Sequence, residues 1–384
     1  MAERIIACRD GAQRTLWPAG QLCGLLFAIA LSVPAAAQDA PPRAGTGASA
    51  AATSLAIPLA VPRLTGRLHA ADIGLVINTA DPYSVAVGAH YIAARGLQAA
   101  QVLRLELPTR AMLNREEFET LRRSVEAFFG HATQALALAW AAPYAVECNS
   151  ITGALALGFD AALCSNGCAA SRSSGYFNSA STRPLFSPGF RPSMLLAARS
   201  VEEARALIDR GVAADGSLLR PGRAAVQALL LTTDDAARRV RMALYPTTGL
   251  PPALGVDLRI APAEVLPGAA RLLLAITGSA RVGLEPAPQW VPGGLGDHLT
   301  SFGGDLQGAH GHSTALDWIA SGATASHGAV SEPCNHPQKF PHPLVLLLHY
   351  LQGSTAIEAY WRSVAWPQQS LFVGEPLSAP FARR

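Results

Sequence analysis

DIGLVINT, residues 72–79, is the stretch that decides the fold. It is a short apolar run bounded by turn-forming residues, which predicts a strand buried on both faces of a sheet. A segment with roughly helical apolar spacing follows over 84–95, and Gly96 stands where that helix would end. VLRLELP (102–108) predicts a second strand. The chain therefore alternates strand and helix from its first ordered element.

The alternation continues toward the C-terminus. Further strands are predicted at ALALAWAAPY (135–144), PSMLLAARS (192–200), AVQALLLTTD (225–234) and RLLLAITG (271–278), and helices after Asn114, over 201–211 and 234–244, and at IEAYWRSVAW (357–366). Continuous Val/Ile/Leu strands between amphipathic helices are typical of an α/β fold. We expect a doubly wound, mostly parallel sheet with helices on both faces. A single α/β domain over 67–384 is predicted, with two domains divided near Arg191 as the alternative.

Composition and charge exclude several classes of function. Half of the 384 residues are apolar and only 15% are charged, which is the profile of a globular protein. The formal net charge of +3 is too small to indicate binding to nucleic acid or to an anionic membrane surface. Lys339 is the only lysine, and nearly all other cationic side chains are arginines. A GC-rich genome explains this bias without any functional reason.

The N-terminus resembles a secretory signal peptide over 1–37. Arginines precede an apolar run over 22–33, about the length of a signal core and short for a bilayer span. Ala35-Ala36-Ala37 then forms a small-residue cleavage pattern, so that Gln38 would begin the mature chain. An uncleaved anchor is the alternative. Residues 38–66, rich in Ala, Pro and Gly, predict a flexible leader. We therefore expect a periplasmic or secreted protein with no membrane span after cleavage.

Four cysteines remain after cleavage: Cys148, Cys164, Cys168 and Cys334. An even number in an oxidising compartment makes all four candidates for disulfides, although free buried thiols and a metal site stay open as alternatives. If all four pair, Cys334 closes a loop of more than about 160 residues with one of the other three, which favours stability through chain entropy. The cysteine spacing fits no standard zinc pattern, and we expect neither a metal nor a cofactor.

Three of these cysteines lie in an irregular stretch at 145–191 that interrupts the strand–helix pattern. Long excursions of this kind inside a compact domain are usually functional lids or linkers. The cysteines favour an ordered lid held by disulfides. Its aromatic residues, expected to be exposed, suggest carbohydrate binding as a further hypothesis; they are Tyr176, Phe177, Phe186 and Phe190.

The C-terminal fifth carries a resemblance to a known fold. GATASHGAVSEPCNHP (322–337), TAIEAYWRSVAWP (355–367) and LFVGEPLSAPF (371–381) read as a small-residue strand, a Cys-bearing loop, a helix and a closing strand. This order resembles the last third of gingipain-like, caspase-fold cysteine peptidases. The resemblance implies a catalytic His-Gly after one strand and a nucleophilic Cys after the next. Here Ser279 stands at the first position, and Thr300 or Ser301 at the second. The resemblance therefore implies the fold without the peptidase activity.

A second resemblance is closer in amino-acid sequence and covers most of the mature chain. AWAAPYAVECNSIT (139–152), RPSMLLAARSVEEARALIDRG (191–211), DHLTSFGG (297–304) and GATASHGAVSEPCNHPQKFPHP (322–343) are similar to an uncharacterised family of secreted bacterial proteins associated with exosortase-type sorting genomes. No activity is attached to that family. It implies an extracytoplasmic surface or matrix context and no mechanism.

Several residues have the chemistry of a hydrolase. Asp297, His298 and Ser301 are the residue types of a catalytic triad, but within five positions they cannot readily take up the separate places that a triad needs. Ser301 with a histidine from elsewhere is one possible pair. Cys334 and His336 alternate with Glu332, so an extended segment would aim the thiol and the imidazole the same way. His310, His312 and Asp317 have the spacing of possible metal ligands, although histidines in a Gly-rich loop are commonly bystanders.

The sequence thus predicts a secreted cell-envelope protein of unknown activity. We expect a catalytically degenerate caspase-like fold with a binding or scaffold role, and we lean against an enzyme. The alternative is an extracytoplasmic, peptidase-like hydrolase that uses Cys334 or Ser301 as nucleophile. The expected partner is a cell-envelope protein or an exopolysaccharide, and not nucleic acid.

Overall fold

The structure, a computed structural model, describes residues 60–219 and 222–383. The predicted signal peptide and the predicted leader up to residue 59 lie outside the described residues. Within the described ranges, none of the helices combines the length and the hydropathy that crossing a bilayer requires.

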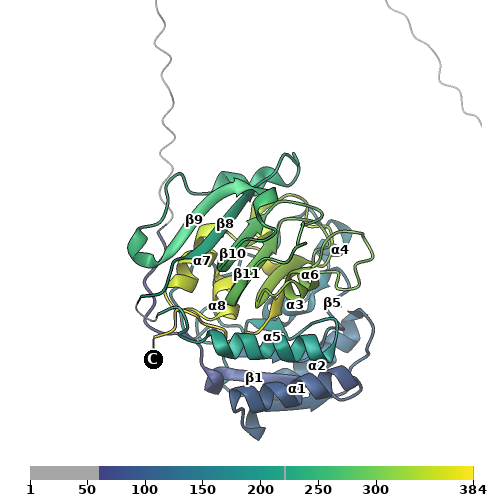
Figure 1. Cartoon of the computed structure of the whole chain (residues 1–384). Helices are drawn as coiled ribbons and strands as arrows, with labels where there is room; N and C mark the ends of the chain where they lie inside the picture. Colours follow the sequence, from purple (N-terminus) through teal and green to yellow (C-terminus); the bar gives the residue numbers. More distant parts are fainter. Residues whose placement is uncertain (1–59, 220–221, 384) are drawn as a thin grey trace, which may run out of the picture. The chain divides into compact units, whose positions relative to one another are not determined.

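A ten-stranded sheet forms the centre of the domain, in the order β2-β1-β4-β7-β13-β12-β11-β10-β8-β9 (Figure 1). Its strands are β1 (Ile73–Asn78), β2 (Val102–Leu105), β4 (Ala135–Leu138), β7 (Ser193–Leu195), β8 (Val226–Thr232), β9 (Val256–Pro262), β10 (Leu272–Thr277), β11 (Trp290–His298), β12 (Ala325–Ala329) and β13 (Ser370–Gly374). The predicted mostly parallel sheet is confirmed. β2, β1, β4 and β7 pair with one another in parallel, and so do β12, β11, β10, β8 and β9. β13 is antiparallel to β12 and meets β7 at Val373, opposite Leu195.

Helices cover both faces of this sheet. They are α1 (Pro82–Arg95), α2 (Arg115–Phe128), α3 (Ile151–Leu157), α4 (Ala162–Ser165), α5 (Val201–Ala214), α6 (Ala315–Ala320), α7 (Pro343–Leu351) and α8 (Ala356–Ser363). Gly296 of β11 faces the indole of Trp318 in α6 so closely that an added Cβ would lie 2.4 Å from it. The opposite face carries Phe372 of β13 against Trp361 of α8, with ring centroids 4.7 Å apart. Strands buried on both sides explain why they read as unbroken apolar runs.

Local signals placed several elements correctly. Asp81 accepts a hydrogen bond from the amide of Tyr83 and begins α1, and Gly96 ends it in the left-handed conformation with φ 66°. Asn114 caps α2 through a capping box with Glu117. Ser200 likewise begins α5. These helix ends depend on neighbouring residues alone, which is why the sequence reveals them.

Other predictions were wrong, and tertiary packing explains them. The strand expected over 135–144 ends at Leu138, because the chain then leaves the large sheet and joins a small second one. That sheet consists of β3 (Met112–Leu113), β5 (Ala145–Val146) and β6 (Asn149–Ser150). Gly211 does not end α5; it lets the helix approach Glu375, whose side chain lies 2.5 Å from where a Cβ would be. Residues 234–244 form only a 3-10 helix, Arg239–Leu244, whose Arg241 turns into the core.

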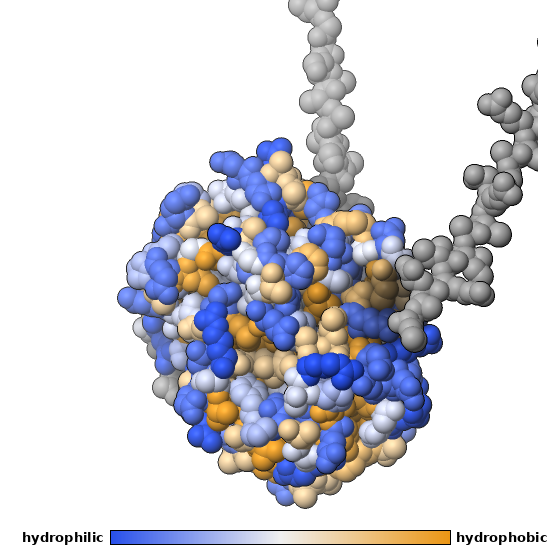
Figure 2. Space-filling model, turned by 90° about the vertical axis from the view of Figure 1, so that its right-hand side faces the viewer, coloured by the Kyte–Doolittle hydropathy of each residue, from blue (hydrophilic) through white to orange (hydrophobic). Residues whose placement is uncertain are grey.

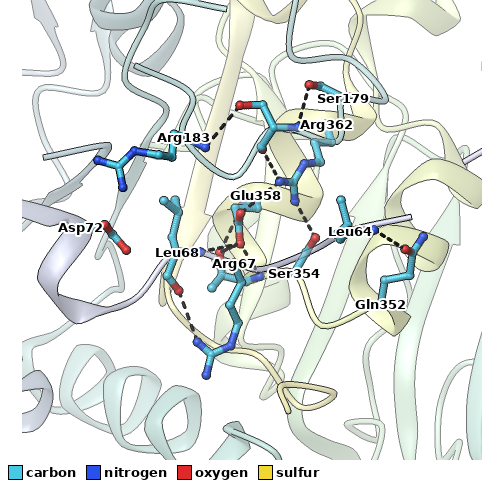
Figure 3. Close-up of polar contacts among 12 residues, drawn as sticks. Leu64, Arg67, Leu68, Asp72, Ser179, Arg183, Gln352, Ser354, Glu358 and Arg362 are labelled. Carbon is cyan, nitrogen blue, oxygen red and sulfur yellow. Dashed lines mark hydrogen bonds and ion pairs between the residues drawn. The ribbon is translucent and has the colours of Figure 1, made fainter. Parts of the chain in front are cut away.

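The chain enters the domain along α7 and α8, and residues 60–66 of the expected leader already contact it (Figure 3). The amide of Leu64 donates to Oε1 of Gln352 at 2.8 Å. The amide of Leu68 donates to Oε2 of Glu358 at 3.2 Å, and Oε1 of Glu358 pairs with Arg362 at 3.1 Å, with both charged side chains fully buried. Arg362 also donates to the carbonyl of Ser181 at 2.7 Å. One buried ion pair therefore joins the start of the domain, α8 and the 145–191 excursion.

Candidate functional site

A buried polar cluster lies at the ends of β10 and β11. Asp297 accepts hydrogen bonds from Arg241 through Oδ2 and contacts Nδ1 of His327 through Oδ1 at 3.0 Å. Arg241 also donates to the carbonyl of Thr277. The side chains of Asp297, Arg241 and His327 are at most 1% exposed. Burial pushes the pKa of Asp297 upward, but Arg241 and His327 outweigh it and hold that pKa below its usual value. Asp297 is therefore an ionised structural anchor.

His298 is held by hydrogen bonds through both ring nitrogens. Nδ1 accepts from the indole N–H of Trp318 at 2.9 Å, so Nε2 carries the proton and donates to the carbonyl of Ser313 at 2.8 Å. The ring is fully buried, and burial lowers its pKa to about 4. A neutral imidazole with neither nitrogen free cannot accept a proton from a nucleophile. Asp297 and His298 are neighbours in the sequence, but in the structure they have separate partners and separate structural roles.

This neutral histidine predicts a specific loss of stability in acid. Its folded pKa of about 4 lies below the ordinary value of 6.5, so the unfolded chain binds the extra proton between these values. The stability that His298 contributes is complete above pH 6.5 and falls by up to about 1.4 kcal/mol per pH unit toward pH 4. Urea unfolding across this range should give a shallower dependence for His298→Asn, whose amide oxygen still accepts from Trp318. Equal pH slopes for the two proteins would contradict the assignment.

A cavity of about 340 Å³ lies beyond the end of β11, with a wall that is partly polar and partly apolar. Its lining consists of Ala237, Arg238, Leu299, Thr300, Ser301, Glu332, Cys334 and Asn335. Nε of Arg238 donates to the hydroxyl of Thr300 at 3.1 Å, and Nη1 pairs with Asp235 at 2.7 Å, so the guanidinium is held at the cavity wall. The cavity offers hydroxyls, an amide, a guanidinium and a carboxylate, which recognise a polar ligand.

The two loops that the sequence singled out leave the same edge of the sheet. β10 and β11 are adjacent and parallel, with Thr277 opposite His298. Gly278 packs against the backbone of Arg238, whose side chain lines the cavity beside Ser301. Ser279 itself donates its hydroxyl to the carbonyl of Arg281 and is not part of the cavity lining. Of the two serines, Ser301 therefore lines the cavity and Ser279 does not.

All four expected cysteines are in disulfides, Cys148–Cys164 and Cys168–Cys334. The first closes a separation of 16 residues and the second a separation of 166. As a disulfide, Cys334 has no thiol to act as a nucleophile, and His336 packs against Trp366 with ring centroids 5.9 Å apart. These bonds are compatible with an extracytoplasmic location. The second disulfide fastens the excursion to the loop that lines the cavity.

Lys339 reinforces the same junction. Its ammonium group donates to the carbonyl of Gly167 at 2.6 Å, next to Cys168, and its side chain is buried. Burial lowers the pKa of Lys339 to about 8, with Glu332 opposing that shift. The single lysine of the chain therefore has a structural place that its rarity alone did not indicate.

The excursion contains regular elements that its irregular sequence did not predict. It contains β5, β6, α3 and α4, and two of its aromatic residues belong to the core: Tyr176 is fully buried and Phe190 is 8% exposed. The expectation that these two are exposed was wrong, because Tyr176 lies under the guanidinium of Arg362 and Phe190 packs on Trp361. Phe186, at 58% exposure, does lie on the surface.

The possible metal ligands also have other partners. His310 pairs with Asp305 at 2.9 Å and stacks on Phe302, while Asp317 caps α6 and pairs with Arg199 at 2.6 Å. In the described part of the chain, no group of three or more His, Cys, Asp or Glu side chains is arranged to hold a metal ion. Figure 2 shows hydrophilic and hydrophobic residues interspersed over the face that it presents, rather than gathered in one apolar patch.

Comparisons of the chain with protein families, with curated proteins and with solved structures gave no match. The site is therefore interpreted from its own geometry. Sequence reasoning missed Arg238, Arg241 and His327 as members of the site. The two arginines lie in a stretch whose sequence is typical of the charged face of a surface helix. His327 lies in a strand of small residues, where no sequence motif indicates an acidic partner for it.

Proposed function

We propose that this protein is a secreted cell-envelope protein with a binding or scaffold role on a catalytically degenerate caspase-like fold. The single observation that carries the proposal is the cavity beside Ser301. It lies where the gingipain-like resemblance implies a nucleophile, and hydroxyl, amide and charged groups line it. Two of the candidates for catalysis are occupied, His298 by two hydrogen bonds and Cys334 by a disulfide.

The chemistry of the lining favours a hydroxyl-rich ligand. The side chains of Thr300, Ser301 and Asn335 can both donate and accept hydrogen bonds. Arg238 adds a positive charge and Glu332 a negative charge. A balanced polar surface of this kind suits a segment of exopolysaccharide better than a strongly anionic or an apolar ligand. The mixed surface in Figure 2 supports recognition through such polar groups rather than through a broad apolar contact.

Binding of oligosaccharides from envelope exopolysaccharides, measured by calorimetry, tests this function. We expect Ser301→Ala and Asn335→Ala each to weaken binding about tenfold, since each removes hydrogen bonds worth about 1–1.5 kcal/mol. Ser173→Ala, an exposed serine of the excursion, is the matched control and should bind as the parent does. Loss of binding in Phe186→Ala with Ser301→Ala unaffected would instead place the ligand on the excursion. Absence of binding to every polymer tested would overturn the proposal.

The second candidate is a serine hydrolase that uses Ser301. Its specific support is that Ser301 lines the cavity and that Nδ1 of His312 lies 2.7 Å from the carbonyl of Ser301. That contact is to the backbone, so it orients the imidazole without activating the hydroxyl. A fluorophosphonate probe should leave Ser301 unlabelled if the binding role holds. Labelling of the parent that is lost in Ser301→Ala would favour the hydrolase.

A further inference from the structure

β9 is the outer edge strand of the large sheet. It pairs with β8 over its whole length, from Val226 opposite Val256 to Thr232 opposite Pro262, and lies at the rim of the sheet (Figure 1). Val256 at the start of the strand is buried, at 4% exposure, Leu258 is half-buried, and Ile260 is 49% exposed. An open edge of this length is a template for pairing with another strand.

The register with β8 shows which backbone groups face outward. The amide of Val226 donates to the carbonyl of Gly255, so in a parallel ladder Asp257 and Arg259 direct their own N–H and C=O groups toward β8. The N–H and C=O groups of Val256, Leu258 and Ile260 then point away from the sheet. In the described part of the chain, no hydrogen bond is recorded from these three residues to a segment beyond β9.

The edge is self-complementary in one antiparallel register. If Leu258 lies opposite Leu258 of a second copy, the outward N–H and C=O groups of the two Leu258 residues pair with each other, and Ile260 of each copy lies opposite Val256 of the other. The same register sets Asp257 opposite Arg259 of the other copy twice, at the closely spaced positions. Centring the pair on Asp257 or on Arg259 instead would place like charges opposite each other.

The sequence also limits the ladder at both ends. Pro262 occupies the next outward-facing position and has no N–H to donate, while Gly255 turns the chain away in the left-handed conformation with φ 64°. The exposed ion pair of Asp257 with Arg259 within one strand shows that the two side chains lie on the same face. Each can therefore exchange its partner for the equivalent charge of a second copy.

We propose that β9 is the interface of a homodimer, in which two copies pair antiparallel about Leu258 and join their sheets into one. The partner is a second copy of this chain, because the outward backbone groups of Leu258 and the charge pair of Asp257 with Arg259 match in the same register. This interface is on β9, whereas Ser301 and its cavity lie beyond the end of β11, so the inference does not depend on the proposed function.

A charge swap tests the interface. Sedimentation velocity of the purified protein should show a dimer, and Asp257→Arg or Arg259→Asp should each raise the dimer dissociation constant at least about tenfold, because like charges then face each other. The double variant Asp257→Arg/Arg259→Asp should restore the dimer. If the two charges only protect a free edge strand from pairing, all three variants should have the same mass in solution as the parent protein.

A backbone variant supplies an independent test. Ile260→Pro removes an outward N–H while leaving the hydrogen bonds to β8, so the domain should retain its circular dichroism spectrum and melting behaviour but lose the dimer. Ile260→Val is the matched control and should remain dimeric. A monomeric parent protein, or single charge reversals with the mass of the parent dimer, would overturn the proposal.

Discussion

Replacing Asp297 with asparagine should lower the free energy of unfolding by about 3–5 kcal/mol. The change removes one negative charge with almost no change of shape. It leaves the guanidinium of Arg241, which is 1% exposed, without its counter-ion. An uncompensated buried charge is among the most destabilising features that a single substitution can create. Chemical denaturation followed by tryptophan fluorescence measures this loss directly.

A double variant separates the charge from the packing. Arg241→Met removes the cation, so Asp297→Asn/Arg241→Met should recover much of the stability lost in Asp297→Asn alone. Glu126→Gln is the matched control for a surface pair, since Glu126 meets Arg122 at 2.5 Å on the exposed side of α2; it should cost less than about 1 kcal/mol. The account fails if Asp297→Asn is no more costly than Glu126→Gln.

Removing the disulfide between Cys168 and Cys334 should cost about 4–5 kcal/mol of stability. The reason is the 166-residue separation that it closes, because a cross-link over a long loop removes much conformational entropy from the unfolded chain. Denaturation of Cys168→Ser/Cys334→Ser without reductant measures the loss. The disulfide also fixes the loop that carries Glu332 and Asn335, so the same variant should bind any ligand of the cavity more weakly.

The other disulfide, Cys148–Cys164, provides a matched control within the same chain. Cys148→Ser/Cys164→Ser opens a separation of only 16 residues and should cost about 3 kcal/mol. In the native parent protein, iodoacetamide should label none of the four cysteines until a reductant is added. Equal losses for the two pairs of substitutions, or labelling of Cys334 in the native protein, would contradict this view of the junction.

The fold was predictable where short-range patterns decide it. Buried strands such as β1 and β10 are continuous apolar runs, and Asp81, Asn114 and Ser200 mark helix starts through bonds to residues two or three positions away. Edge strand β9 gave no such signal, because its charged and apolar residues alternate only over a short span before Pro262. The irregular appearance of 145–191 likewise hid its short helices and strands.

The site was less predictable because its partners are far apart in the sequence. Asp297 was singled out as an acidic residue, but its role depends on Arg241 and His327, 56 and 30 positions away. The tautomer and neutrality of His298 depend on Trp318 and on the carbonyl of Ser313, neither of which is marked by a motif. The pairing of the four cysteines was also open, since their spacing permits more than one connectivity.

The position of β13 has a consequence for how this protein reaches its native state. The last strand of the chain is inserted in the middle of the sheet, between β7 and β12, so the two halves of the sheet form one continuous hydrogen-bonded ladder only when β13 is in place. During synthesis, the ribosome must release nearly the whole polypeptide before the hydrophobic interior closes.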